Sequence, residues 1–227
     1  MTGERLEDLG KQAGSRLGSL REAEYKRIMV YLAQCQTVLD VGCGTGTLLA
    51  KAPGRFKGVD LNPENVAYCS SLGLDADLGD ALALPFEDAS FDGVVSSHVM
   101  QCFTPSEAAT HLRELARITR VGGVVVISTL NWFPQFFRHP ENARPYPPQA
   151  VNAYFAKQSG SQSPTFGNMP VLAPSALWCR RPPLVTVRSA RRTAQRIAGL
   201  TNRAQYQAGL RKWWTYDAYV AKYVRRS

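Results

Sequence analysis

The sequence predicts an α/β fold in which a Rossmann-like, doubly wound and mainly parallel sheet carries helices on both faces. Between residues 20 and 130, short apolar runs alternate with segments of helical periodicity, which is typical of a parallel sheet covered on both sides. A glycine-rich turn at residues 42–46 follows the first apolar run, where such sheets bind ligands. A basic segment after residue 190 is expected to add a helical extension.

The individual elements follow from periodicity and from the residues that begin and end them. A helix is expected over residues 20–34, because Tyr25, Ile28, Met29 and Leu32 recur at three- and four-residue spacing. The elements expected after it, in order, are strand 37–41, helix 47–52, strand 55–61, a helix from residue 62, strand 76–78, strand 91–99, a helix from residue 104 and strand 124–129.

Two of the expected helices begin with capping sequences. Asn62 is suited to the N-cap position and Pro63 to the first helical position of the next helix. Thr104, Pro105 and Glu107 have the spacing of a capping box with proline at its first helical position. These residues place the starts of both helices.

The character of the sequence changes after residue 129. Aromatic residues and prolines accumulate, and the sequence loses a clear period. The expected segments are an irregular loop over residues 131–148, a helix over 148–157, a mobile loop or lid over 159–170, one or two strands over 177–189 and helical structure from residue 190.

Composition narrows the class of protein. The chain has 227 residues, of which 44% are hydrophobic and 20% charged, and no apolar run approaches the ~20 residues that span a bilayer. Residues 1–12 lack the apolar core of a signal peptide. Five cysteines at wide spacing indicate neither a zinc site nor a disulfide framework, so we expect a cytoplasmic protein without a metal.

Basic residues are concentrated in the last part of the chain. Residues 131–227 contain 15 lysines and arginines and two acidic residues, whereas the preceding part is mildly acidic. Projected onto a helix, residues 206–226 separate aromatic and apolar side chains from basic ones. Such a helix suits the surface of an anionic membrane, the protein's own domain or RNA. We therefore expect peripheral attachment to the inner membrane face as one option.

The glycine turn belongs to no phosphate-binding pattern. A dinucleotide fingerprint requires glycine or alanine where this sequence has Thr47, and a phosphate loop requires lysine followed by serine or threonine. The spacing is instead glycine at positions 42, 44 and 46, preceded by Asp40. Asp60 ends the next strand and Asp80 follows the one after it, and three acids suit a ligand with a ribose and an amine better than one with phosphates.

Four motifs in order carry a family resemblance: VLDVGCGTG, GVDLNPENV, GDALALPFEDASFDGVVSSHV and LRELARITRVGGVVVIS. Together they resemble the class I S-adenosylmethionine-dependent methyltransferase family, and the resemblance covers about residues 20–130. It implies a seven-stranded sheet, completed by a last helix and two further strands. It also implies a methyltransferase domain over residues 1–189, with residues 131–175 as acceptor-binding or lid insertion, before the basic extension 190–227.

The resemblance implies S-adenosylmethionine as cofactor and assigns roles at the sheet edge. Asp60 would accept the ribose hydroxyls, Asp80 the adenine amine, and the Ala81 backbone N–H would bind the ring. Asp40 would hold the glycine loop and the methionine ammonium, which would also meet a carbonyl near Ser96 or Ser97. The full set of expected cofactor-binding residues is Tyr25, Asp40, Gly42, Cys43, Gly44, Gly46, Asp60, Leu61, Asp80, Ala81 and Ser97.

His98 is the candidate base, because it follows the fourth strand at the ligand-binding edge and imidazole titrates near neutral pH. The alternative is that His98 only packs on the cofactor or a helix. His139, Trp132 and Phe133 lie in the aromatic loop and are candidates for contact with the acceptor. His111 is expected on a helix surface.

These features predict an enzyme that methylates an oxygen of a small molecule, a sugar or a lipid-linked glycan. One alternative is a tRNA or rRNA methyltransferase that binds RNA through the basic segment. A non-catalytic module with a methyltransferase-like fold is a second alternative, which the intact glycine turn and the acids of the next strands disfavour. The acceptor and the oligomeric state are not predicted.

Overall fold

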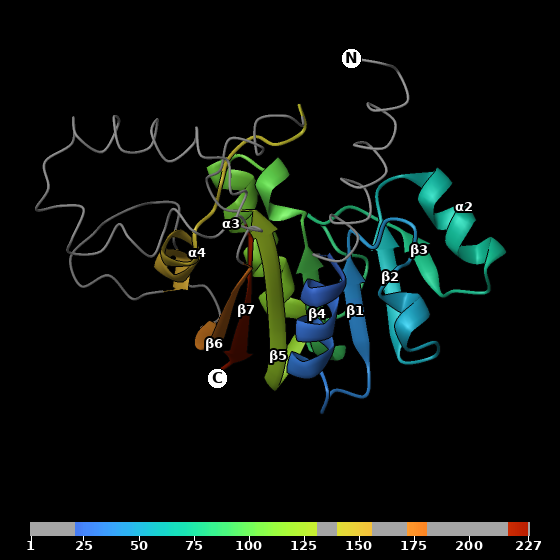
Figure 1. Cartoon of the computed structure of the whole chain (residues 1–227), viewed down its shortest axis with the longest axis horizontal. Helices are drawn as coiled ribbons and strands as arrows, with labels where there is room; N and C mark the ends of the chain where they lie inside the picture. The colour runs from blue at the N-terminus through green and yellow to red at the C-terminus, as the bar shows by residue number, and fades with distance from the viewer. Residues whose placement is uncertain (1–20, 131–139, 156–171, 181–217, 227) are drawn as a thin grey trace, which may run out of the picture.

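The computed structural model describes residues 21–130, 140–155, 172–180 and 218–226 (Figure 1). Strands from residues 21–130, 172–180 and 218–226 form one seven-stranded sheet, in the order β3-β2-β1-β4-β5-β7-β6. The strands are β1 (Val38–Val41), β2 (Phe56–Asp60), β3 (Ala76–Leu78), β4 (Phe91–Ser97), β5 (Thr119–Leu130), β6 (Leu172–Arg180) and β7 (Ala218–Arg225). Neighbours from β3 to β5 pair in parallel, and β7 pairs antiparallel with β5 and β6. The expected fold class is confirmed.

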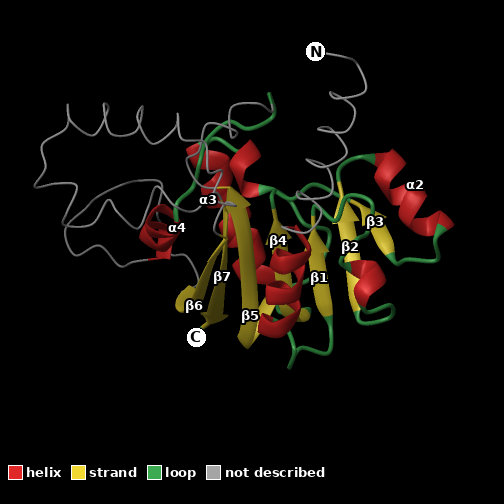
Figure 2. Cartoon of the chain, viewed as in Figure 1, coloured by secondary structure: helices red, strands yellow, loops and turns green. Residues whose placement is uncertain are grey.

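Helices cover both faces of this sheet (Figure 2). Residues 21–31 are helical and precede β1. The helices that follow are the 3₁₀ turn η1 (Leu49–Lys51), α2 (Pro63–Ser71), the 3₁₀ turn η2 (Met100–Cys102), α3 (Pro105–Ile118) and α4 (Pro148–Phe155). The helix expected over residues 47–52 is therefore only the single 3₁₀ turn η1. No helix within the described ranges is long and apolar enough to cross a membrane.

The capping sequences start their helices where the sequence places them. The Asn62 side chain accepts the backbone N–H of Glu64 at 2.9 Å, at the start of α2. At the start of α3 the Thr104 hydroxyl accepts from the Glu107 backbone, and the Glu107 carboxylate accepts from the Thr104 backbone. Each pair satisfies backbone groups that a helix end leaves without an intrahelical partner.

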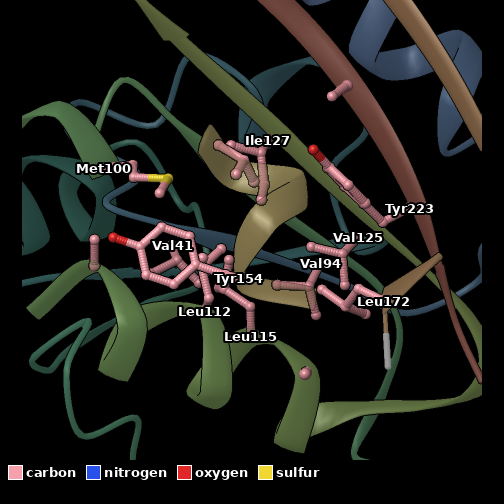
Figure 3. Close-up of a cluster of buried hydrophobic side chains, with 14 of the residues drawn as sticks. Val41, Val94, Met100, Leu112, Leu115, Val125, Ile127, Tyr154, Leu172 and Tyr223 are labelled. Atoms are coloured by element: carbon pink, nitrogen blue, oxygen red, sulfur yellow. The ribbon is translucent and has the colours of Figure 1, made fainter. Parts of the chain in front are cut away.

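Two apolar clusters hold the layers together. On one face, Leu112 and Leu115 of α3 pack against Val94 and Val125 of the sheet (Figure 3). On the other face, Ile28 and Leu32 pack against the neighbouring residues of the same strands, Val95 and Val126. Consecutive strand residues point to opposite faces, so both faces need apolar side chains, and the strands read as continuous apolar runs.

Residues 218–225 form strand β7, so the helix expected over residues 206–226 is wrong for this part; residues 206–217 lie outside the described ranges. Tyr219 and Tyr223 belong to the cluster of α3, whereas Val220 lies in the opposite cluster. Arg225, expected on a solvated basic face, donates hydrogen bonds to the carbonyls of Arg117 and Thr119. A strand covered on both faces has no polar–apolar alternation, so periodicity alone does not distinguish it from a helix.

This strand also changes the expected division of the chain. β7 lies between β5 and β6, inside the sheet of the domain expected over residues 1–189. The predicted extension of residues 190–227 therefore does not include residues 218–225, and residues 181–217 lie outside the described ranges.

Candidate functional site

The candidate site lies at the carboxyl edge of the parallel strands. Because β1, β2, β3 and β4 are mutually parallel, the residues that follow them meet at one edge. The strand order reverses direction between β1 and β4, which is where open α/β sheets bind ligands. This edge brings together the glycine turn, Asp60, Asp80, Ala81, Ser97 and His98.

The glycine turn has a backbone that only glycine adopts without strain. Gly42, Gly44 and Gly46 have φ angles of 71°, 54° and 76°. A Cβ on Gly42 would lie 2.3 Å from the Val99 side chain, and one on Gly46 would lie 2.7 Å from Leu74. A Cβ on Gly44 would meet no atom within 4 Å. The turn is thus packed at both ends and open in the middle, where a ligand can approach the backbone.

Asp60 ties the second strand to this turn. One carboxylate oxygen accepts the Gly44 backbone N–H at 2.7 Å. The other accepts the backbone N–H of Asn62 at 2.9 Å and the side-chain amide of Asn65 at 3.1 Å. A carboxylate has about four acceptor sites, so three bonds leave room for roughly one more. Asp60 is therefore placed to accept a ligand hydroxyl while it fixes the turn.

Asp40 is the buried acid behind the turn, with its residue 3% exposed. Burial, and then the charge of Asp60, raise the pKa of its carboxyl from 3.8 to about 8. Burial disfavours the ionised form because the surroundings solvate charge poorly. A cationic amine bound at this edge would favour the ionised form, which suits the role that the resemblance gives to Asp40.

Asp80, Leu61 and Tyr25 are further expected cofactor residues, and each has exposed surface. Asp80 is exposed, and its carboxylate accepts the Leu82 backbone N–H at 2.8 Å. Leu61 is 70% exposed, so its side chain is free to contact a ligand. Tyr25 is half-buried and its ring faces the Lys51 ammonium, 5.6 Å from the centroid. Their contacts with a cofactor stay predictions.

His111 is buried, so the expectation of a helix-surface position is wrong. Its Nδ1 lies 3.0 Å from the Ala81 carbonyl and its Nε2 2.9 Å from the Ser96 hydroxyl. A carbonyl only accepts, so Nδ1 carries the proton and the Ser96 hydroxyl donates to Nε2. Burial lowers the pKa of His111 to about 4, which keeps the ring neutral. The sequence held a signal, because His111 precedes Leu115 by one helical turn on the apolar face of α3.

His98 follows β4 directly and has a left-handed backbone, with φ of 60°. Its backbone N–H donates to the Ser128 carbonyl at 2.8 Å. Its ring Nε2 lies 2.8 Å from a carboxylate oxygen of Glu24, in the helix of residues 21–31. The sequence analysis did not select Glu24, although it lies four and eight residues before Ile28 and Leu32, on the buried stripe of its helix.

Part of the expected site falls outside the described residues. His139, Trp132 and Phe133, the candidates for acceptor contact, all lie in residues 131–139, and the structure does not describe them. Among the described residues, no cluster of three or more histidine, cysteine or acidic side chains could hold a metal ion.

Comparison with known families identifies the domain. Residues 39–127, which include the glycine turn, Asp60, Asp80 and His98, match the methyltransferase domain family. Residues 39–127 therefore carry a methyltransferase domain. S-adenosylmethionine is the cofactor of this domain, and the open backbone at Gly44, the remaining acceptor capacity of Asp60 and the buried acid Asp40 fit its ribose and ammonium.

Individual relatives agree on the domain. A malonyl-[acyl-carrier protein] O-methyltransferase of Herminiimonas arsenicoxydans is 41% identical over 98 residues, which are 41% of this chain and 36% of that protein. A fatty-acid O-methyltransferase of Mycolicibacterium smegmatis is 39% identical over 98 residues, 38% of this chain and 34% of that protein. The matches thus span about a third of each relative.

A solved structure extends the likeness of fold beyond the matched sequence. A SAM-dependent methyltransferase from Archaeoglobus fulgidus superposes with a TM-score of 0.60 at 19% identity. The superposition covers 91% of this chain and 94% of that one. The methyltransferase domain and that protein therefore share one architecture.

Proposed function

We propose that this protein is an S-adenosylmethionine-dependent O-methyltransferase that acts on a hydroxyl of a small molecule, a sugar or a lipid-linked glycan. The observation that carries the proposal is the position of His98. Its ring Nε2 forms a hydrogen bond of 2.8 Å with a Glu24 carboxylate oxygen, at the edge that carries the glycine turn and Asp60. When bound, S-adenosylmethionine supplies a methyl group that its positively charged sulfur activates for transfer.

The residues of this chain would bind the cofactor, align the reactants and accept the proton of the acceptor. Asp60, the Gly44 backbone, Asp80 and the Ala81 backbone would hold the ribose and adenine, and Asp40 would meet the ammonium. Fixing both reactants in line removes much of the entropic barrier to transfer. A hydroxyl is a weak nucleophile until it loses its proton, and His98 is placed to accept that proton.

Two of the relatives support oxygen as the acceptor atom. The malonyl-[acyl-carrier protein] and fatty-acid enzymes are both named as O-methyltransferases, and one acts on a lipid. A carboxylate needs no base at neutral pH, whereas a hydroxyl does. The histidine–carboxylate pair is therefore the feature that favours a hydroxyl acceptor.

Cofactor binding is the first test. Titration calorimetry should show that the protein binds S-adenosylmethionine and that Asp60→Asn weakens binding about tenfold or more, through loss of charge-assisted hydrogen bonds. Asp75→Asn is the matched control, because Asp75 is an exposed acid that pairs with Lys57 at 2.8 Å. Its affinity should equal that of the unmodified protein. Absence of binding would contradict the whole proposal.

Transfer to matched acceptors is the second test. Labelled S-adenosylmethionine is incubated with hexadecanol, methyl glucoside, palmitic acid and bulk tRNA. We expect transfer to a hydroxyl compound, and His98→Asn should reduce it by about 10²-fold, the typical contribution of a general base. Transfer to palmitic acid alone would contradict a hydroxyl acceptor. Transfer to tRNA alone would favour the RNA methyltransferase instead.

A further inference from the structure

We infer that Glu24 is the positioning residue of His98, an inference that rests on the proposed function of His98 as base. Glu24 lies in the helix of residues 21–31, whose buried stripe continues with Ile28 and Leu32. This helix lies in front of β4, between β5 and β1 (Figure 2). The Glu24 side chain is 1% exposed, so its carboxyl group is buried at this point.

The contact between the two side chains selects one form of the imidazole. The Glu24 oxygen Oε2 lies 2.8 Å from Nε2 of His98, a distance typical of a charge-assisted hydrogen bond. A carboxylate only accepts, so Nε2 carries the proton and donates it. The lone pair of the neutral ring is then on Nδ1. Nδ1 is therefore the nitrogen that can take a proton from an acceptor.

The main-chain conformation of His98 also restricts the position of its ring. A φ of 60° is rare for residues with a Cβ and costs free energy, so the surroundings must hold it in place. The bond from the His98 N–H to the Ser128 carbonyl at the end of β5 does so. The main chain and Glu24 thus orient the imidazole together, and the side chain is only 16% exposed.

The burial of Glu24 needs an explanation that packing does not supply. Taking a carboxylate out of water is costly, and a well-packed apolar residue at such a position is often as stable or more so. Ile28 and Leu32 occupy the following positions of the same stripe. Glu24 has a carboxyl group in the first position of this stripe, and that group contacts the imidazole at the cofactor edge.

Nuclear magnetic resonance of ¹⁵N-histidine tests this inference without any acceptor. The chain has three histidines, and His98→Asn and His111→Asn assign their signals. At alkaline pH, where an imidazole is neutral, we expect a slowly exchanging proton on Nε2 of His98 and an unprotonated Nδ1. His111 is the internal reference, because the Ala81 carbonyl fixes its proton on the opposite nitrogen, Nδ1.

Glu24→Leu removes the acceptor and fills the space with an apolar side chain. The Nε2 proton of His98 should then exchange with water at least about tenfold faster, the factor that a charge-assisted hydrogen bond contributes. Glu22→Leu is the matched control, since it removes an exposed acid of the same helix that pairs with Lys51 at 2.9 Å. It should leave the His98 signals unchanged, and unaltered His111 signals would report an intact fold in each variant.

Two results would overturn the inference. One is an unmodified protein whose His98 has its proton on Nδ1 or no protected ring proton. The other is a folded Glu24→Leu variant with unchanged exchange of the Nε2 proton. Failure of the proposed function is a separate result, because it appears as absence of S-adenosylmethionine binding in calorimetry whatever the spectrum of His98 shows.

Discussion

The Ser96 hydroxyl donates to Nε2 of His111 at 2.9 Å, inside the core and next to the cofactor edge. The other ring nitrogen of His111 donates to the Ala81 carbonyl at 3.0 Å. One neutral ring therefore links the end of β4 to the turn that the resemblance assigns to adenine binding. The bond to Ser96 is buried and the bond to Ala81 is partly buried, so the Ser96 hydroxyl has no water as a substitute for the ring.

His111→Leu should destabilise the protein and loosen the turn at Ala81. It leaves a buried hydroxyl and a carbonyl without their partner, which costs roughly 2–4 kcal/mol in the free energy of unfolding. Urea unfolding measures this value. The double variant His111→Leu with Ser96→Ala removes the unpaired hydroxyl and should recover part of the loss. A single variant as stable as the unmodified protein would show that the ring is dispensable.

Gly44→Ala should reduce the affinity for S-adenosylmethionine by about tenfold or more, because its Cβ would project into the open face of the turn. Gly54→Ala is the matched control: Gly54 also has positive φ and open space around its missing Cβ, but it lies beyond η1, away from the edge. Both variants should lose about 1 kcal/mol of stability through backbone strain. Calorimetry measures the affinity of each variant for S-adenosylmethionine. Equal affinities of the two variants would show that the cofactor does not approach Gly44.

Asp40 should make both stability and cofactor binding depend on pH. Its pKa is about 8 in the folded protein and near 3.8 when unfolded, so the folded state binds the extra proton between these values. The contribution of Asp40 to the free energy of unfolding therefore falls as pH rises from about 4 to 8. Denaturant unfolding across this range should show a flatter profile for Asp40→Asn.

The same group should release a proton when the cofactor binds. The ammonium of S-adenosylmethionine would favour the ionised carboxyl and lower the pKa of Asp40. Calorimetry at neutral pH in buffers of different ionisation enthalpy measures the protons released. Asp40→Asn should abolish that part of the release, and an unchanged release would place the ammonium elsewhere.

Tyr219→Phe should cost about 1–2 kcal/mol in the free energy of unfolding, because it removes one buried hydrogen bond. The Tyr219 hydroxyl donates to the Tyr146 carbonyl at 2.6 Å, which ties β7 to the chain before α4. Tyr68→Phe is the control on an exposed ring and should leave stability unchanged. Equal stability of the two variants would argue against the burial of β7 in the sheet.

Sequence signals sufficed where the information is local. Asn62 and Thr104 begin their helices because a side-chain oxygen reaches a backbone N–H two or three residues away, a distance that spacing fixes. The three glycines indicate a turn with positive φ, and all three have it. The sequence predicts β1, β2, β4 and β5 as apolar runs because both faces of the sheet are covered there.

The failures concern partners far apart in the chain. Glu24 and His98 are 74 residues apart, so no local pattern joins them. Residues 218–225 satisfy the helical period, yet they pair with residues 124–130 on one side and 172–180 on the other. The backbone groups of this segment bond to those of distant strands. Side-chain periodicity within the segment does not reveal such partners.

The sequence by itself determined the class of fold, the first five strands, the helix starts and the acids that mark the methyltransferase domain. Those features depend on contacts between near neighbours or on one alternating pattern. Only the tertiary structure decided that β7 completes the sheet, that His111 is buried and that Glu24 holds His98. Each of these depends on buried hydrogen bonds between groups that are distant in the chain. Only the packing of the helices on the sheet brings those groups together.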